Sequence, residues 1–209
     1  MKQGVIFDMD GVLVETEHFY FKRRMQFFDE LKIEPPTRRI QDFVGLTNDM
    51  IWNMLVPKNK ERRRALKEEY VNFSKKHEVC FSDLLNPSVR ELFNKLKDKK
   101  VKIAIASSSE KKYILEMLEQ CKLGEYADFV ISGEECKQSK PDPEIYIKAV
   151  KALDLSEAEV LAVEDSTLGI RAAKSAGITV CALVQKNYDI DQSEADYEIN
   201  DLMEILTQL

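Results

Sequence analysis

Polar side chains follow four apolar segments of the chain, either at the end of the segment or in the loop after it. The clusters are Asp8 with Asp10, Ser107 with Ser108, Lys140, and Glu164 with Asp165. If the apolar segments are strands of one parallel sheet, their carboxyl ends meet at one edge and bring these clusters together. The resulting site would contain four carboxylates, serine hydroxyl groups and an ammonium group.

A site of this composition suits a divalent cation next to a phosphate group. Four neighbouring carboxylates repel one another unless a cation neutralises them, and oxygen ligands without histidine or thiolate suit Mg²⁺. A lysine and a serine beside the metal could bind the oxygens of a phosphate. One carboxylate can attack phosphorus and form an acyl phosphate. A second carboxylate, two residues further along, can protonate the leaving oxygen and later activate the incoming one.

Short apolar runs and helical patterns alternate along much of the chain. Strands are expected at residues 4–7, 101–106, 129–131, 160–163 and 179–184. Helices are expected at 110–121, at 143–153 with Asp142 as the N-cap, and at 168–176 before Gly177. This alternation predicts an α/β fold with a doubly wound parallel sheet.

The segment 16–80 differs from the rest because it contains no clear strand. Helical patterns occupy residues 17–31, 38–43, 48–55 and 61–76, and Pro35 and Pro36 interrupt them. We therefore predict a discontinuous α/β core formed by residues 1–15 and 81–209. An α-helical cap of residues 16–80 is inserted after the first strand, with a cleft between the two parts.

Composition indicates an ordinary water-soluble globular protein and excludes several partners. The 209 residues are 44% hydrophobic and 33% charged, with a formal net charge of −6, which argues against nucleic acid binding. Four cysteines without a C-x-x-C pair and only two histidines argue against a zinc site. No apolar run reaches membrane-spanning length, and no signal peptide is visible. We expect a cytoplasmic monomer with no membrane partner.

The four clusters, in this order, resemble the motifs of the haloacid dehalogenase superfamily of phosphotransferases. The matching segments are FDMDGVL at 7–13, Ser107 after an apolar run, KPDP at 140–143, and VEDS at 163–166 followed by Gly169. The resemblance covers essentially the whole chain. The helical insertion fits the subgroup with a small α-helical cap, and the β-phosphoglucomutase-like and sugar-phosphate phosphatase proteins are the most similar.

This resemblance implies a role for each cluster. Asp8 would be the nucleophile and a metal ligand, and Asp10 the general acid and base, whose backbone carbonyl also binds the metal. Glu164 and Asp165 would complete the Mg²⁺ site, directly or through water. A true dehalogenase would need neither a metal nor an acid at position 10, so phosphate chemistry is favoured. The phosphoryl group would be held by Ser107, Ser108 and Lys140.

Residues of the cap are expected to contact the substrate. By the same resemblance these are Thr16, Tyr20, Gly45 and Asn48. Mutases of this group typically carry a histidine where Tyr20 stands and an arginine near the place of Asn48. The resemblance thus favours a Mg²⁺-dependent phosphatase of a small phosphorylated metabolite, a sugar phosphate, acting through an aspartyl phosphate. The alternative is a phosphosugar mutase of the β-phosphoglucomutase type.

Each cluster also has an ordinary structural explanation. Asp8 and Asp10 could form a turn before Gly11, and Ser107 with Glu110 fits a capping box that opens the next helix. Lys140 could be a surface lysine, and the acidic pair at 164–165 could start a helix. A non-catalytic binding protein that kept the fold is a further alternative. A dinucleotide-dependent oxidoreductase is disfavoured because no G-x-G-x-x-G turn follows the first strand.

Overall fold

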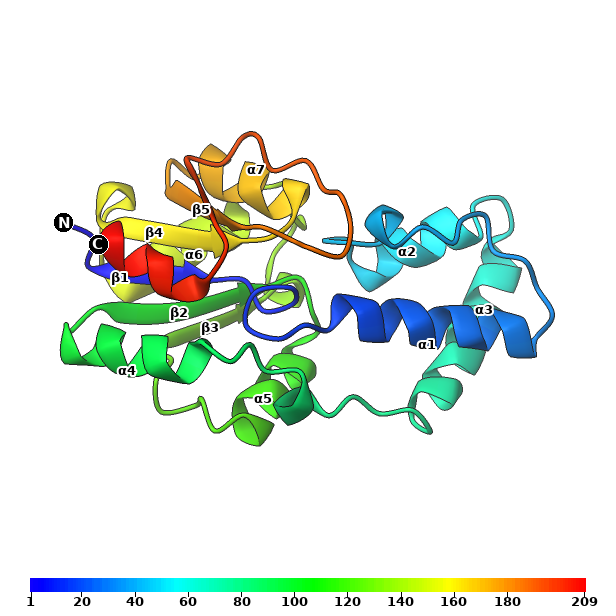
Figure 1. The fold of residues 1–209 in the computed structure, drawn as a ribbon. Coiled ribbons are helices and arrows are strands. Elements are labelled where there is room, and N and C mark those ends of the chain that lie inside the picture. Colours follow the sequence, from blue (N-terminus) through cyan, green and yellow to red (C-terminus); the bar gives the residue numbers. More distant parts are fainter.

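Six parallel strands form the centre of the computed structural model, which describes residues 1–209 (Figure 1). The strand order confirms the predicted doubly wound sheet, because the chain starts in the middle and adds strands on both sides. The strands are almost entirely apolar, as expected for strands covered on both faces. Across the sheet they are β3 (Phe129–Ser132), β2 (Lys102–Ser107), β1 (Gly4–Phe7), β4 (Val160–Glu164), β5 (Thr179–Leu183) and β6 (Tyr197–Ile199).

Helices cover both faces of this sheet, and successive residues of each strand face opposite sides. One face packs against α4 (Val89–Asp98), α5 (Lys111–Gln120) and the C-terminal 3₁₀ turns at Leu202–Thr207. The other face packs against α6 (Glu144–Leu153) and α7 (Thr167–Ser175). None of the helices combines the length and the apolar character required to cross a lipid bilayer.

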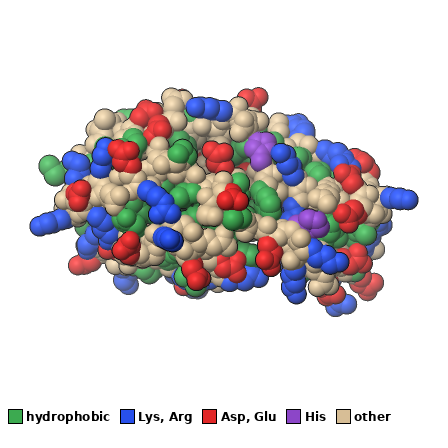
Figure 2. All heavy atoms as spheres, turned by 60° about the horizontal axis from the view of Figure 1, so that its bottom comes forward, with side chains coloured by type: hydrophobic (Ala, Val, Ile, Leu, Met, Phe, Trp, Pro, Cys, Tyr) green, Lys and Arg blue, Asp and Glu red, His purple; other side chains and the backbone are tan.

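Three further helices form a separate unit beside the sheet, at the right of Figure 1. They are α1 (Glu17–Glu30), α2 (Asn48–Leu55) and α3 (Lys60–Ser74). Their shared core is aromatic: the Phe27 and Tyr70 ring centroids lie 5.2 Å apart, and those of Trp52 and Tyr70 lie 5.6 Å apart. On the face shown in Figure 2, Lys and Arg side chains are interspersed with Asp and Glu over both parts of the molecule.

The two chain connections between this unit and the sheet pair with each other. The backbone N–H of Glu15 donates to the carbonyl of Leu84 (2.8 Å), and that of Asn86 donates to Leu13 (2.9 Å). A β-bridge also joins Val14 to Leu85. The predicted boundaries at 15/16 and 80/81 lie close to this paired connection and remain a prediction.

Several local expectations differ from the structure. The helix predicted at 38–43 is wrong, because only a short 3₁₀ turn forms, at Ile40–Asp42. The predicted N-cap Asp142 lies one position too early, because Pro143 is the N-cap of α6 and the Asp142 carboxylate instead accepts the N–H of Glu144 (2.9 Å).

Two elements were absent from the predictions. Helix α4 was recognisable from the sequence, because its apolar residues follow the helical period. All four of them are buried: Val89, Leu92, Phe93 and Leu96. Strand β6 is different, because only Ile199 of its three residues is buried and no apolar run marks it. Its strand conformation depends on pairing with β5.

Candidate active site

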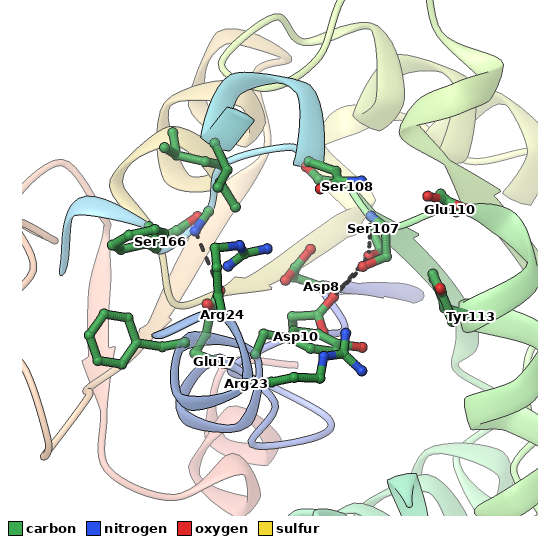
Figure 3. Close-up of a pocket in the computed structure, with 18 of the residues that line it drawn as sticks. Asp8, Asp10, Glu17, Arg23, Arg24, Ser107, Ser108, Glu110, Tyr113 and Ser166 are labelled. Carbon is green, nitrogen blue, oxygen red and sulfur yellow. Dashed lines mark hydrogen bonds between the residues drawn. The ribbon is translucent and has the colours of Figure 1, made fainter. Parts of the chain in front are cut away.

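The ends of β1, β2 and β4 and the helical unit line one cavity of about 190 Å³ (Figure 3). Of the residues predicted for the site, those on its wall are Asp8, Asp10, Ser107, Ser108, Lys140, Asp165, Tyr20, Gly45 and Asn48. The other two lie behind the wall, Glu164 against Lys140 and Thr16 against Asp10. The structure thus brings all the predicted clusters into one place, although they span most of the chain.

The loop after β1 presents the two aspartates to the cavity. Its first residue is anchored to the sheet, because the Asp8 N–H donates to the carbonyl of Val163 (3.0 Å). Gly11 then turns the chain with a φ of +80°. A Cβ atom at Gly11 would lie 2.0 Å from Oδ2 of Asp165, so a side chain would displace that carboxylate. Glycine is therefore required here for its backbone conformation and for the close approach of two loops.

Lys140 lies between two carboxylates at the floor of the site. Its Nζ is 2.7 Å from Oδ1 of Asp8 and 2.6 Å from Oε1 of Glu164, and its side chain is 3% exposed. Burial disfavours the ammonium group, but the attraction of the two carboxylates outweighs it and raises the pKa of Lys140. The hydroxyl of Tyr146, on α6, donates a further hydrogen bond to Oε1 of Glu164 (2.5 Å). Lys140 is therefore a buried, charged residue, and the surface-lysine alternative is wrong.

Asp8 and Asp10 have different surroundings. Burial raises the pKa of Asp8, against the opposing attraction of Lys140. Asp10 contacts hydroxyl groups: its Oδ1 accepts from Thr16, and its Oδ2 accepts from Ser109 at 2.7 Å and from Ser107 at 3.4 Å. Burial also raises the pKa of Asp10, and these hydrogen bonds oppose that shift.

Ser107 does not form the capping box with Glu110 that was the alternative explanation for this residue. Glu110 is the N-cap residue of α5 and its side chain forms no capping hydrogen bond; the N–H of Lys111, the first residue of the helix, donates instead to Glu134 (2.8 Å). The Oγ of Ser107 instead accepts the N–H of Ser109 (3.0 Å) and lies at the end of β2, facing Asp10. The capping-box alternative is therefore wrong, because the chain makes an additional turn between the strand and the helix.

The carboxylates of Asp8, Glu164 and Asp165 suit a metal ion. One oxygen from each lies within 4.8 Å of the others, all three residues are buried, and Lys140 supplies a single positive charge. Burial, together with the neighbouring carboxylates, raises the pKa of Asp165 well above its usual range. A hard divalent cation such as Mg²⁺ would relieve this repulsion. Because Lys140 and Tyr146 already contact Oε1 of Glu164, the other two carboxylates have more capacity to bind a metal.

A loop of the helical unit packs against the site next to the three carboxylates proposed to bind a metal. Gly45, with a φ of +72°, is packed so closely that a Cβ atom there would lie 2.7 Å from Cβ of Ser166. Its N–H donates to Oε1 of Glu17 (3.4 Å). Asn48, the first residue of α2, and Tyr20, on α1, also face the cavity. The helical unit therefore contacts the start of α7, next to Asp165.

Sequence reasoning did not assign many further residues on this wall to the site. Among the polar ones are Glu17, Arg23, Arg24, Ser109, Tyr113 and Ser166. A signal for some of them was present, because positions 17, 20 and 24 lie on one face of a helix and Arg24 interrupts an apolar pattern. This pattern identifies site residues only when it is known that this face of α1 packs against the cavity.

Glu17 should make the stability of the protein depend on pH. Burial, and then the charge of Asp10, raises the pKa of Glu17 to about 8. The folded protein then keeps a proton that the unfolded chain loses above pH 4.5, so this contribution to stability disappears as the pH rises from 4.5 to 8. We expect Glu17→Gln to stabilise the protein by about 3 kcal/mol more at pH 8 than at pH 5.

Urea denaturation of the metal-free protein at both pH values measures this difference. The control is Glu69→Gln, an exposed glutamate on α3 without a hydrogen bond or ion pair. A pH-independent effect of Glu17→Gln would show that the folded protein holds Glu17 ionised.

Residues 5–183 match the family described as Haloacid dehalogenase-like hydrolase. The chain is 37% identical over 185 residues to the phosphorylated carbohydrates phosphatase of Thermotoga maritima, covering 84% of this chain and 82% of that protein. It is 32% identical over 193 residues to the putative phosphatase YhcW of Bacillus subtilis, covering 88% and 84%.

The crystal structure of a putative β-phosphoglucomutase from Thermotoga maritima superimposes with a TM-score of 0.77 at 30% identity and full coverage of both chains. These relatives confirm the predicted subgroup and the prediction of a phosphatase-type enzyme. With the motif residues gathered in one cavity, the chain belongs to the family of haloacid dehalogenase-like hydrolases.

Proposed function

We propose that this protein is a Mg²⁺-dependent phosphatase of a small phosphorylated carbohydrate and that Asp8 is its nucleophile. The observation that carries the proposal is the contrast between two carboxylates on one cavity wall. Asp8 contacts the ammonium group of Lys140, whereas Asp10 contacts only hydroxyl groups. Lys140 favours the ionised form that a nucleophile needs, and the environment of Asp10 allows the protonated form that a general acid needs.

The proposed reaction has two displacement steps at phosphorus. An Asp8 oxygen attacks the phosphorus atom, the bond to the sugar oxygen breaks, and protonated Asp10 gives its proton to that leaving oxygen. Water then attacks the phosphorus of the aspartyl phosphate while the Asp10 carboxylate takes its proton. The bond to Asp8 breaks, which releases inorganic phosphate and restores both residues.

The remaining residues bind and orient the reacting group. Lys140 and the hydroxyl groups of Ser107 and Ser108 would hold the phosphoryl oxygens. Mg²⁺ held by Asp8, Asp165 and the Asp10 carbonyl, with Glu164 alongside, would neutralise negative charge around the phosphoryl group. The loop at Gly45, packed against Ser166, would limit the access of bulk water during the first step.

Phosphate release is the direct test of this function. The purified protein is incubated with Mg²⁺ and a panel of phosphorylated sugars, including β-glucose 1-phosphate with a trace of the bisphosphate, and followed by ³¹P NMR. Free phosphate as the main product is the expected result. Isomerisation without free phosphate would instead identify a mutase, which is the activity that the name of the Thermotoga maritima crystal structure gives to that protein.

Removal of the metal should stop turnover. We expect EDTA to lower phosphate release by at least about 100-fold and Mg²⁺ to restore it, because without the ion the single charge of Lys140 faces three buried carboxylates. Saturating Mg²⁺ should also stabilise the folded protein, by about 2.7 kcal/mol at 100 times its dissociation constant. This stabilisation by Mg²⁺, measured by thermal unfolding, should disappear in Asp165→Asn. Full activity in EDTA would contradict the metal assignment.

A further inference from the structure

Arg24 is a buried cation that forms no hydrogen bond and no ion pair within the protein. Its residue is only 6% exposed, its Nε has no hydrogen-bond partner, and no carboxylate forms an ion pair with it. Its neighbours are aromatic, with the guanidinium carbon 5.7 Å from the ring centroid of Phe43 and 5.4 Å from that of Tyr70. A buried charge that lacks a partner is costly, so its presence on a cavity wall indicates a ligand that supplies the opposite charge.

Arg23 places a second guanidinium group on the same wall. Its Nε donates to the hydroxyl of Tyr70 (3.1 Å) and its Nη1 to the carbonyl of His77 (2.9 Å), which leaves Nη2 without a protein partner. The ring centroid of Tyr20 lies 5.1 Å from its guanidinium carbon. Arg23 is therefore held rigidly by α3 and the residues after it, with one N–H₂ group available for a ligand.

The arginines share the cavity with the proposed nucleophile but belong to the other part of the molecule. Both extend from α1 (Figure 3), whereas Asp8 directly follows β1 and Lys140 lies in the loop before α6. Glu17 lies on the same helix and wall, but it accepts the N–H of Gly45 and forms no ion pair with Arg24. A ligand that contacts residues from both parts of the molecule therefore meets one cationic group at Lys140 and others at the two arginines.

We infer that Arg24, assisted by Arg23, forms a second anion subsite that selects phosphorylated substrates carrying a carboxylate or a second phosphate at their non-reacting end. This inference rests on the proposed function, because it describes the part of the substrate that does not react. Guanidinium groups suit both anions, since their planar N–H pairs match the oxygens of carboxylates and phosphates. Mutases of this group carry an arginine near the position of Asn48. In this chain the positive charge on the cap side of the cavity comes instead from Arg23 and Arg24 on α1.

Two matched pairs of substrates test the subsite and distinguish its two anions. Glucitol 6-phosphate and 6-phosphogluconate differ by a carboxylate at the end remote from the phosphate, and fructose 6-phosphate and fructose 1,6-bisphosphate differ by a second phosphate. We expect kcat/KM to favour the anionic member of at least one pair by about tenfold or more. In Arg24→Met this ratio should fall by about 10- to 100-fold. Arg62→Met, an exposed arginine on α3, should leave it unchanged.

The ratio separates substrate selection from a structural role. If Arg24 only supports the aromatic core, Arg24→Met lowers kcat/KM for both members of a pair equally, which would overturn the inference. No preference in the wild type would overturn it as well.

Failure of the proposed function is recognised separately, as an absence of phosphate release from every compound. In that case calorimetric titration of Asp8→Asn with the same two pairs decides. The subsite is supported if Asp8→Asn binds the anionic member of a pair more tightly and the additional substitution Arg24→Met abolishes this difference. Equal binding of both members by Asp8→Asn rejects the subsite.

Discussion

Asp8→Asn is expected to lower phosphate release by at least about 10⁴-fold while leaving the fold intact. The amide nitrogen and oxygen are poor nucleophiles, so the first displacement at phosphorus cannot occur. The substitution is nearly isosteric, and the amide oxygen can still accept the hydrogen bond that Lys140 donates to Asp8. Neutralising a buried carboxylate removes no apolar packing, so the melting temperature should change by only a few degrees.

Activity and thermal unfolding are measured on the same preparation, with Mg²⁺ present. Asp83→Asn, an exposed aspartate in a 3₁₀ turn, is the matched control and should retain full activity. Retention of more than about one hundredth of the wild-type rate by Asp8→Asn would remove Asp8 from the role of nucleophile. Loss of activity together with loss of the folded state would instead show that Asp8 is needed for structure.

Lys140→Met is expected to lower both stability and activity. Methionine is similar in length to lysine, but the substitution removes the ammonium group. Asp8 and Glu164 are then buried carboxylates without their cation. Breaking a buried ion pair in this way costs about 3–5 kcal/mol. Turnover should fall by at least about 100-fold, because the phosphoryl group and the nucleophile lose the same positive charge.

Urea denaturation and phosphate release measure the two effects. The control is Lys148→Met, which removes an exposed i,i+4 ion pair to Glu144 and should cost less than about 1 kcal/mol. Added Mg²⁺ should recover part of the stability of Lys140→Met, since the cation supplies charge to the same carboxylates. A Lys140→Met protein as stable and active as the control would contradict the proposed role of Lys140.

The helical unit limits what local patterns can predict. Helices α1, α2 and α3 were expected nearly at their observed positions, because their polar and apolar residues follow the helical period. Which face of α1 lines a cavity was not predictable, since that depends on how the unit packs against the sheet. Arg24 shows the difference: in the sequence it is one arginine among many charged residues, and in the structure it is buried and unpaired.

The sequence by itself determined the five strands β1 to β5, the order of the clusters and the identity of Asp8, Asp10, Lys140 and Asp165 as candidates. Apolar runs specify buried strands, and residues at the ends of parallel strands must meet at one edge. These are local properties combined with one general rule of topology.

Only the tertiary structure decided the contacts within the site. They are the pairing of Lys140 with Glu164, the hydrogen bond from Tyr146, the hydrogen bond from Ser109 to Asp10, and the two arginines on the cavity wall that contains the nucleophile. Each of them brings together residues of different elements. Such contacts depend on the angles and separations at which packed elements lie, and many different sequence spacings are compatible with them. For this reason the chemistry of the candidate site was predictable from the residues, whereas its charge balance and its selectivity required the fold.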